Sequence, residues 1–343
     1  MSGPPKIETN VPRISSGKCV LFAITSPDGI SRSALRKAAR LAGALGAELE
    51  LFYRGFDPDL LHPSRLSSGS GEEGIRAFVE NRQKQLWSLA EDLRKPGLSV
   101  RTRVEWDCRP AEGIVREVLH KQPALLIVES FRKSPAEGLL FAQTLHKLIE
   151  LCPCPLLIVR RASAYPANPR VVAAVDPMHA HAKPAALDTA ILKAASEVSE
   201  ALEGELHLFH ARVPWAIVSH QSRAVRWVPD VAKDEAQVTY EHVVLARVTD
   251  LARRYNIPSL CTHVVDGDVT DCLPSYLGAD PVQIVAMGAL SRSFLARILI
   301  GNTARRLLDD LDCDVLVVKP PGFRTPVTLR DPMEHETDQT VPG

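Results

Sequence analysis

The sequence has few aromatic residues, no excess charge of either sign and no long hydrophobic run. Phe, Trp and Tyr make up 5% of the 343 residues, so the core must be built from aliphatic side chains. Lys plus Arg and Asp plus Glu number 41 each, which leaves no global positive field to attract nucleic acid. No apolar stretch approaches the roughly 20 residues that span a bilayer, and residues 1–18 have no apolar core of the kind a secretory signal needs. We therefore expect a cytoplasmic protein that binds neither membrane nor specific nucleic acid.

The sequence has few cysteines, and their spacing does not indicate disulfide pairs. The seven cysteines are an odd number spread over a long chain, which argues against a disulfide framework and fits a reducing compartment. Cys152 and Cys154 flank a proline and look like a redox pair. However, a Cys-Pro-Cys segment just before a strand seldom meets disulfide geometry. Both cysteines are interpreted as small, buried residues at the entry of a strand.

Short β-branched runs alternate with amphipathic windows along the chain. The pattern predicts strands at 19–24, 48–53, 100–106, 124–128 and 155–159, and again at 171–175, 205–211, 259–265, 282–287 and 315–319. Helices are predicted between most of these strands; Ser31, for example, can cap a helix that Gly46 ends. The order predicts an α/β fold of two tandem Rossmann-like domains, each a five-stranded parallel sheet flanked by helices.

The two halves form an internal repeat. Residues 154–160 (CPLLIVR) match residues 313–319 (CDVLVVK) at an offset of 159 residues. We place an N-terminal domain at 18–162 and a C-terminal domain at 168–323, and expect the polar, acidic residues 324–343 to form a flexible tail. The final strand of each parallel sheet would otherwise leave an open edge, so the two final strands are predicted to pair and form an intramolecular pseudo-dimer.

The second repeat contains a loop suited to phosphate. Gly288 ends a buried strand, where a ligand can approach the backbone, and Gly301, Asn302 and Thr303 open the next helix. The first N–H groups of a helix lack intrahelical partners and carry the positive end of its dipole, so such a turn can bind an anion. Arg292, in the intervening loop, can add a charge-assisted contact. The alternative is that Asn302 or Thr303 simply caps the helix, as is common where a strand leads into a helix.

Several stretches together resemble the universal stress protein family in its tandem form. They are the strand end Ala174-Val175-Asp176, the strand at 206–211, Arg109-Pro110-Ala111-Glu112, Gly301-Asn302-Thr303-Ala304 and Thr325-Pro326-Val327. The resemblance covers about residues 18–323. It implies a HUP-type fold, like that of the adenine nucleotide alpha hydrolases, and a role in the stress response. It also implies association into homodimers, although a tandem chain can satisfy that interface internally.

The resemblance also implies a nucleotide site in the second repeat. In nucleotide-binding members of the family, an Asp at the end of the first strand contacts adenine or ribose, and a Gly-x2-Gly-x9-Gly-Ser/Thr loop holds the phosphates. Asp176, after Val175, matches the Asp. Gly288, after Met287, matches the first Gly, and Gly301 matches the third. The implied cofactor is ATP or another adenine nucleotide, with Mg²⁺ if bound.

Two positions of this loop depart from the family pattern. Ser291 replaces the second Gly, and its Cβ would clash if that position needs positive φ. Asn302 stands where Ser or Thr is usual, with Thr303 next. The first repeat departs further, because the offset of 159 residues places Glu129 opposite Gly288. A carboxylate there would repel phosphate, so the first repeat is predicted not to bind ATP in the family manner.

The resemblance implies a non-catalytic binding and signalling module whose ligand is a nucleotide or another small molecule. A slow ATP hydrolase at the same site and a binder of a non-nucleotide ligand remain open as alternatives. No Ser-His-Asp order, carboxylate pair or HExxH is recognisable, so we assign no catalytic residue. His207 and His210 lie three residues apart on a predicted strand and point to opposite faces, so no metal site is predicted there.

Overall fold

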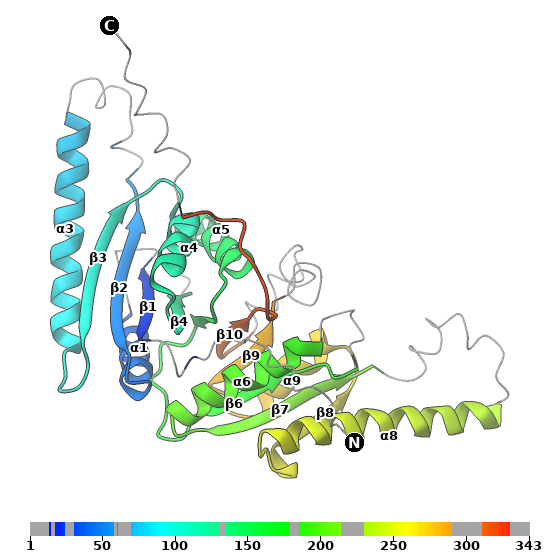
Figure 1. The fold of residues 1–343 in the computed structure, drawn as a ribbon. Coiled ribbons are helices and arrows are strands. Elements are labelled where there is room, and N and C mark those ends of the chain that lie inside the picture. The colour runs from blue at the N-terminus through cyan, green and yellow to red at the C-terminus, as the bar shows by residue number, and fades with distance from the viewer. Residues whose placement is uncertain are drawn as a thin grey trace, which may run out of the picture.

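The computed structural model describes residues 14, 18–24, 31–57, 60, 70–130, 135–178, 185–213, 230–289 and 311–329. Its centre is one ten-stranded sheet (Figure 1) with the strand order β3-β2-β1-β4-β5-β10-β9-β6-β7-β8. The first repeat supplies β1 (Cys19–Ile24), β2 (Glu48–Gly55), β3 (Val100–Trp106), β4 (Leu125–Glu129) and β5 (Leu156–Val159). The second supplies β6 (Arg170–Ala174), β7 (Glu205–Arg212), β8 (Thr262–Asp266), β9 (Ile284–Gly288) and β10 (Asp314–Val318).

The two repeats join through their final strands, as the sequence predicted. Within each repeat all strand pairs are parallel. At the junction β5 and β10 pair antiparallel, with Leu157 opposite Leu316. The pairing gives each final strand a neighbour on both sides, so neither inner edge is left open.

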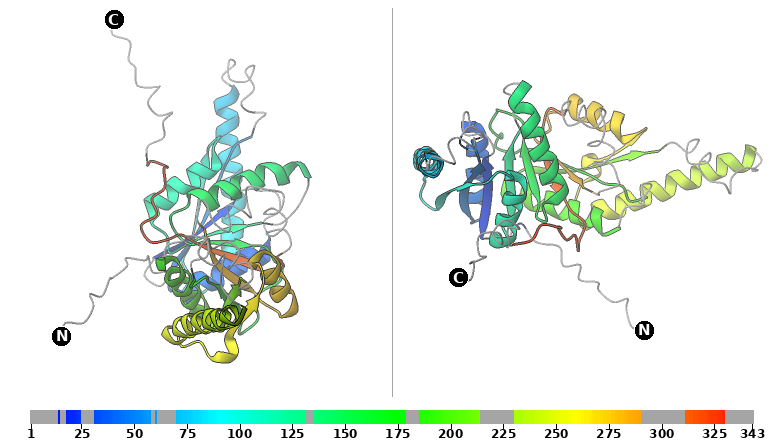
Figure 2. Two further views of the ribbon diagram at one scale, coloured as in Figure 1. Left: turned by 90° about the vertical axis from the view of Figure 1, so that its right-hand side faces the viewer. Right: turned by 90° about the horizontal axis from the view of Figure 1, so that it is seen from above.

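Helices cover both faces of the sheet. On one face α1 (Arg32–Ala44), α3 (Ser70–Leu93), α6 (Ala185–Ala201) and α8 (Asp230–Arg254) share a single apolar cluster. On the other face α4 (Pro110–Lys121), α5 (Pro135–Leu151) and α9 (Val269–Ala279) share a second cluster. Figure 2 shows α8 and α9 on opposite sides of the strands of the second repeat. Because both faces are covered, the central strands β1, β5 and β10 are almost continuously apolar. No helix in the described ranges is long and apolar enough to cross a membrane.

Local sequence explains where α1 begins and ends. Ser31 is its N-cap, and its hydroxyl accepts hydrogen bonds from the N–H groups of Ser33 and Ala34 at 3.2 and 3.4 Å. Gly46, with φ +63°, follows the C-cap and lets the chain turn away. The prediction from Ser31 and Gly46 is confirmed.

The second repeat differs from the predicted elements at two points. The helix α9 was not predicted; it contains Pro274, a residue that usually interrupts a helix because it lacks a backbone N–H. Asp268 caps α9, and Leu273 and Leu277 bury its inner face. The strand predicted at 259–265 begins three residues later, since residues 259–261 form a 3-10 turn. The helix predicted from Thr303 lies outside the described residues, as does the tail beyond residue 329.

A buried ion pair ties the two repeats together. The Lys37 amino group on α1 lies 2.7 Å from Asp314 Oδ2 on β10, and both side chains are buried. Asp314 also accepts hydrogen bonds from the Tyr165 hydroxyl at 2.7 Å and from the N–H groups of Arg160 and Arg161 at 2.8 and 3.0 Å. Lys37 donates a second bond to Arg161 O at 2.9 Å. Burial lowers the pKa of Lys37 while Asp314 opposes that effect, so the amino group depends on its partner to stay charged.

Candidate functional site

The candidate site lies where the strand order of the second repeat reverses. β6 and β9 are parallel neighbours, and the chain leaves them toward opposite ends of the sheet. Val175 and Asp176 follow β6, while Met287 and Gly288 end β9. Ligands of open α/β sheets bind in the crevice outside the carboxyl ends of strands at such a point. The structure therefore brings these four predicted residues to the edge where a ligand is expected.

The backbone around Asp176 is held firmly. Val175 N–H donates to Phe209 O at 2.9 Å, and His210 Nδ1 donates to Val175 O at 3.1 Å. Asp176 N–H donates to the buried carboxylate of Asp188 on α6 at 3.0 Å. Asp176 Oδ2, in contrast, is buried and has no hydrogen-bond partner among the residues that the structure describes. A buried acceptor without a donor is unfavourable, so this oxygen is suited to accept a hydrogen bond from a ligand.

Further residues that sequence reasoning missed support this loop. Arg247 on α8 donates to Pro177 O at 3.1 Å, and Tyr240 on α8 donates to Val213 O at 3.0 Å. Burial raises the pKa of the Tyr240 hydroxyl, and the nearby Asp176 carboxylate raises it further. For Asp188 a signal was available, because it is an acidic residue inside the otherwise apolar stretch that opens α6. Arg247 and Tyr240 carry no such signal, since α8 is predominantly polar.

Gly288 has a packing reason to be glycine. A Cβ at this position would lie 2.6 Å from Leu187 Cδ2 and 2.9 Å from Leu187 Cγ, and Leu187 is buried. The strand end and the first turn of α6 therefore approach each other more closely than a side chain allows. The sequence predicted that a ligand approaches the backbone at Gly288. In the structure, Leu187 of α6 makes such a close approach.

The first repeat fills the equivalent position with its own anion. Glu129, the counterpart of Gly288, ends β4. Its two carboxylate oxygens lie 2.9 and 3.2 Å from the N–H of Ser31, the N-cap of α1. The carboxylate thus sits at the positive end of the helix dipole, where a negative charge is favoured. A second anion at this point would be repelled.

The rest of the predicted phosphate loop is outside the described residues. This applies to five residues: Ser291, Arg292, Gly301, Asn302 and Thr303. Their assignment to a ligand remains a prediction.

The other candidate residues have structural surroundings. His207 stacks on His263 with 3.0 Å between Nδ1 and Nε2, whereas His210 bonds to Val175 O, so the two histidines do not come together. Burial, aided by Arg170, lowers the pKa of His207. No cluster of three His, Cys, Asp or Glu side chains suited to a metal occurs in the part of the chain that the structure describes.

The two cysteines of the Cys-Pro-Cys segment are free thiols. Cys152 and Cys154 are buried, and their sulfur atoms lie 3.5 Å apart. The interpretation as buried residues at the entry of β5 is confirmed. Their mutual hydrogen bond and burial raise the pKa of Cys154, which disfavours a reactive thiolate.

Comparison with known proteins supports the same architecture. The sequence model of the universal stress protein family matches residues 18–160 and again 168–319. Universal stress protein E of Photorhabdus laumondii is 25% identical over 313 residues, which cover 90% of this chain and 96% of that protein. Universal stress protein E of Escherichia coli K12 is 24% identical over 312 residues, covering 91% and 97%.

Solved structures agree in fold. A putative universal stress protein from Pseudomonas aeruginosa UCBPP-PA14 matches with a TM-score of 0.64 and 22% identity, over 90% of this chain and 95% of that one. A functionally unknown protein from P. aeruginosa PAO1 matches with a TM-score of 0.63 and 22% identity, over 90% and 94%. Since the family model matches twice and the two matched segments form the two halves of one continuous sheet, the chain belongs to the universal stress protein family in its tandem form.

Proposed function

We propose that this protein is a non-catalytic binding and signalling module of the stress response, with an adenine nucleotide such as ATP held by its second repeat. The contrast between Glu129 and Gly288 carries the proposal. One repeat supplies its own carboxylate at the strand end beside a helix N-terminus. The other has no side chain at the matching position. An exogenous anion is therefore favoured in the second repeat only.

Asp176 is proposed to orient the nucleoside. Its Oδ2 atom is buried and receives no hydrogen bond from any described residue, and ribose hydroxyls and the adenine amino group are donors. The proposed phosphate contacts come from Gly288, Ser291, Arg292, Gly301, Asn302 and Thr303. Mg²⁺ would enter on the nucleotide phosphates, because this ion is usually bound through substrate phosphates and one or two carboxylates.

We also propose a cellular location and an assembly state for the protein. We place the protein in the cytoplasm, where ATP is available. Because β5 and β10 already cover each other, we propose that the internal pseudo-dimer takes over the pairing that a single-domain family member needs from a second chain.

Titration calorimetry with ATP tests the nucleotide site. We expect the wild type to bind and Asp176→Asn to bind more weakly by about 1 kcal/mol, since the amide oxygen can still accept a hydrogen bond but carries no charge. Asp271→Asn, an equal change of charge at an exposed position on α9, should bind like the wild type. No binding by the wild type would leave a non-nucleotide ligand as the alternative. Phosphate release above background that Asp176→Asn abolishes would favour a slow hydrolase.

A pair of variants can separate a ligand-binding role of Gly288 from its role in packing against α6. Gly288→Ala alone should destabilise the protein, because its Cβ overlaps Leu187. Adding Leu187→Ala creates room for that Cβ and should recover much of the stability. If the folded double variant still fails to bind ATP, the glycine serves the ligand. If binding returns, the glycine serves the helix packing alone.

A further inference from the structure

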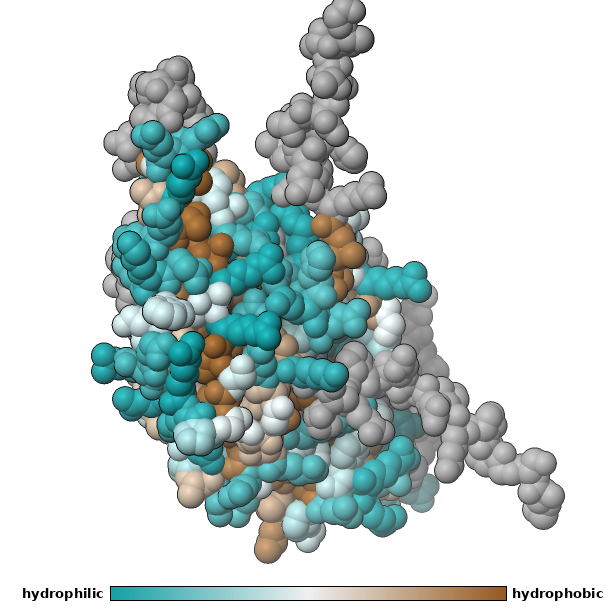
Figure 3. Space-filling model, turned by 60° about the vertical axis from the view of Figure 1, so that its left-hand side comes forward, coloured by the Kyte–Doolittle hydropathy of each residue, from teal (hydrophilic) through white to brown (hydrophobic). Residues whose placement is uncertain are grey.

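A hollow lies beside the first repeat, away from Asp176 and Gly288. It has a volume of about 850 Å³ and runs between α1, the end of α3 and residues 95–98, with Tyr165 at one end. Figure 3, which brings the α3 side of the molecule forward, shows apolar surface between polar side chains on this face. The volume is within the range of small-molecule sites, roughly 300–1,000 Å³.

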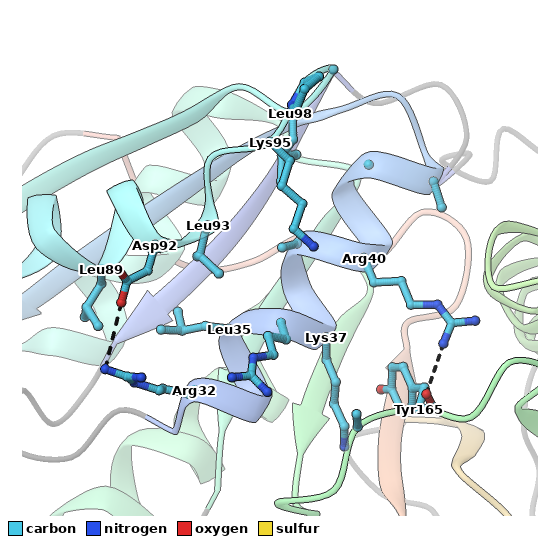
Figure 4. A pocket seen from close by; sticks show the side chains of 17 residues that line it. Arg32, Leu35, Lys37, Arg40, Leu89, Asp92, Leu93, Lys95, Leu98 and Tyr165 are labelled. Carbon is cyan, nitrogen blue, oxygen red and sulfur yellow. Dashed lines mark hydrogen bonds and ion pairs between the residues drawn. The ribbon is translucent and has the colours of Figure 1, made fainter.

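The wall that α1 forms is strongly cationic. The helix carries four cations and no acid within Arg32–Ala44. Arg32, Arg36 and Arg40 recur every four residues, so they lie in one row along the hollow. Like charges at this spacing destabilise a helix. Lys95 points its amino group into the same space from the opposite wall (Figure 4).

Three of these cations, Arg36, Arg40 and Lys95, have no acidic partner among the described residues. Arg40 donates to the backbone carbonyls of residues 165, 166, 167 and 202, and Arg32 lies 3.9 Å from Asp92 with both side chains exposed. The side chains of Arg36 and Lys95 make no hydrogen bond or ion pair to any described residue. They are the groups left to receive an anion.

Part of the remaining lining is apolar: Leu89 and Leu98 are half-buried, whereas Leu35 and Leu93 are only 2% and 6% exposed. Leu89 and Leu93 extend from α3 toward α1, where Leu35 faces them (Figure 4). Leu98 completes this apolar wall. The aromatic side chain of the lining, Tyr165, is buried and bound to Asp314, so it offers no stacking surface for a nucleic-acid base.

We infer that this hollow binds an amphiphilic anion, a molecule that joins an alkyl chain to a phosphate or carboxylate group. Arg36 and Lys95 hold the anionic group, and the half-buried side chains of Leu89 and Leu98 cover the chain, next to Leu35 and Leu93, which are buried in the core. The cations of α1 then bind the anionic group, and the apolar side chains facing them contact the alkyl chain. The inference does not depend on the proposed nucleotide site.

Calorimetric titration with decyl phosphate below its micellar concentration tests the inference. We expect saturable binding that weakens with added salt, as exposed charges are screened. Inorganic phosphate and decyltrimethylammonium should each bind at least tenfold more weakly, because one lacks the chain and the other the negative charge. Decanoate is titrated in parallel, and whichever of the two anions binds more tightly identifies the anionic group.

The variants locate the site. Arg36→Gln with Lys95→Gln should weaken binding of decyl phosphate by about tenfold or more, since two charge-assisted contacts are lost. Arg76→Gln with Lys84→Gln removes the same charge from exposed positions on α3 outside the hollow and should change nothing. Equal affinity of both double variants, equal binding of the cationic amphiphile, or no binding by the wild type would overturn the inference. Asp176→Asn should leave this affinity unchanged, which separates it from the nucleotide proposal.

Discussion

The ion pair between Lys37 and Asp314 should be the most sensitive point of the junction between the repeats. Asp314→Asn keeps the size of the side chain but removes the charge that compensates the buried amino group. Removing one partner of a buried pair costs about 3–5 kcal/mol, because the other charge stays buried without compensation. The free energy of unfolding in urea at pH 7 should fall by about this amount.

The hydrogen bonds predict an asymmetry between the two partners. After Lys37→Met the carboxylate still has three donors, from Tyr165, Arg160 and Arg161. The loss of unfolding free energy should therefore be smaller than for Asp314→Asn. The double variant should be more stable than the sum of the single losses by about 1–3 kcal/mol, as expected for groups in direct contact.

A neighbouring exposed pair provides the control. Asp312 lies 2.9 Å from Arg161 with most of its side chain in solvent. Asp312→Asn should change stability by no more than about 1 kcal/mol. A loss below about 1 kcal/mol for Asp314→Asn, together with additive single effects, would refute the view that this pair holds the repeats together.

Three further outcomes follow from the structure. Burial lowers the pKa of Lys319 to about 8. Between about pH 8 and 10.5 the unfolded chain therefore binds a proton that the folded protein has lost, so the free energy of unfolding should rise with pH over this range. Urea titrations at several pH values should show a steeper rise for the wild type than for Lys319→Met. Gly204→Ala should lower the melting temperature because its Cβ would overlap Pro169 O. Gly278→Ala in α9 should instead raise the free energy of unfolding by about 0.5–1 kcal/mol, because no described atom lies within 4 Å of the added Cβ. Glu129→Gln should cost about 1 kcal/mol in urea unfolding, because its amide oxygen can still accept from Ser31 N–H but no longer places a negative charge at the start of α1, and an unchanged stability would contradict the role of that carboxylate.

Part of the candidate site was readable in the sequence. Asp176 and Gly288 were expected at strand ends, and parallel strands place such ends at one edge of the sheet. The repeat offset also placed Glu129 opposite Gly288. The contact between Glu129 and Ser31 was not readable, because the two residues are 98 positions apart. Nor was the contact of Gly288 with Leu187, which gives the glycine a packing role in addition to the proposed one.

The helix α9 shows why local patterns can mislead. Pro274 argues against a helix in the sequence, yet the capping bond from Asp268 and the burial of Leu273 and Leu277 outweigh it. Propensity is a weak preference that packing overrides.

The sequence by itself determined the alternation of strands and helices, the duplication and the pairing of the two final apolar strands. The alternation follows from hydrophobic periodicity, which is a property of a few neighbouring residues. The duplication follows from the match of residues 154–160 to residues 313–319, and the pairing from the open edge that each parallel sheet would otherwise leave. Only the tertiary structure decided which of the four cations on α1 is buried, because the partner of Lys37 is 277 residues away. It also decided that Arg36 and Lys95, from separate parts of the first repeat, line one hollow. A charge acquires its role from the groups that folding places around it, and those groups come from distant parts of the chain.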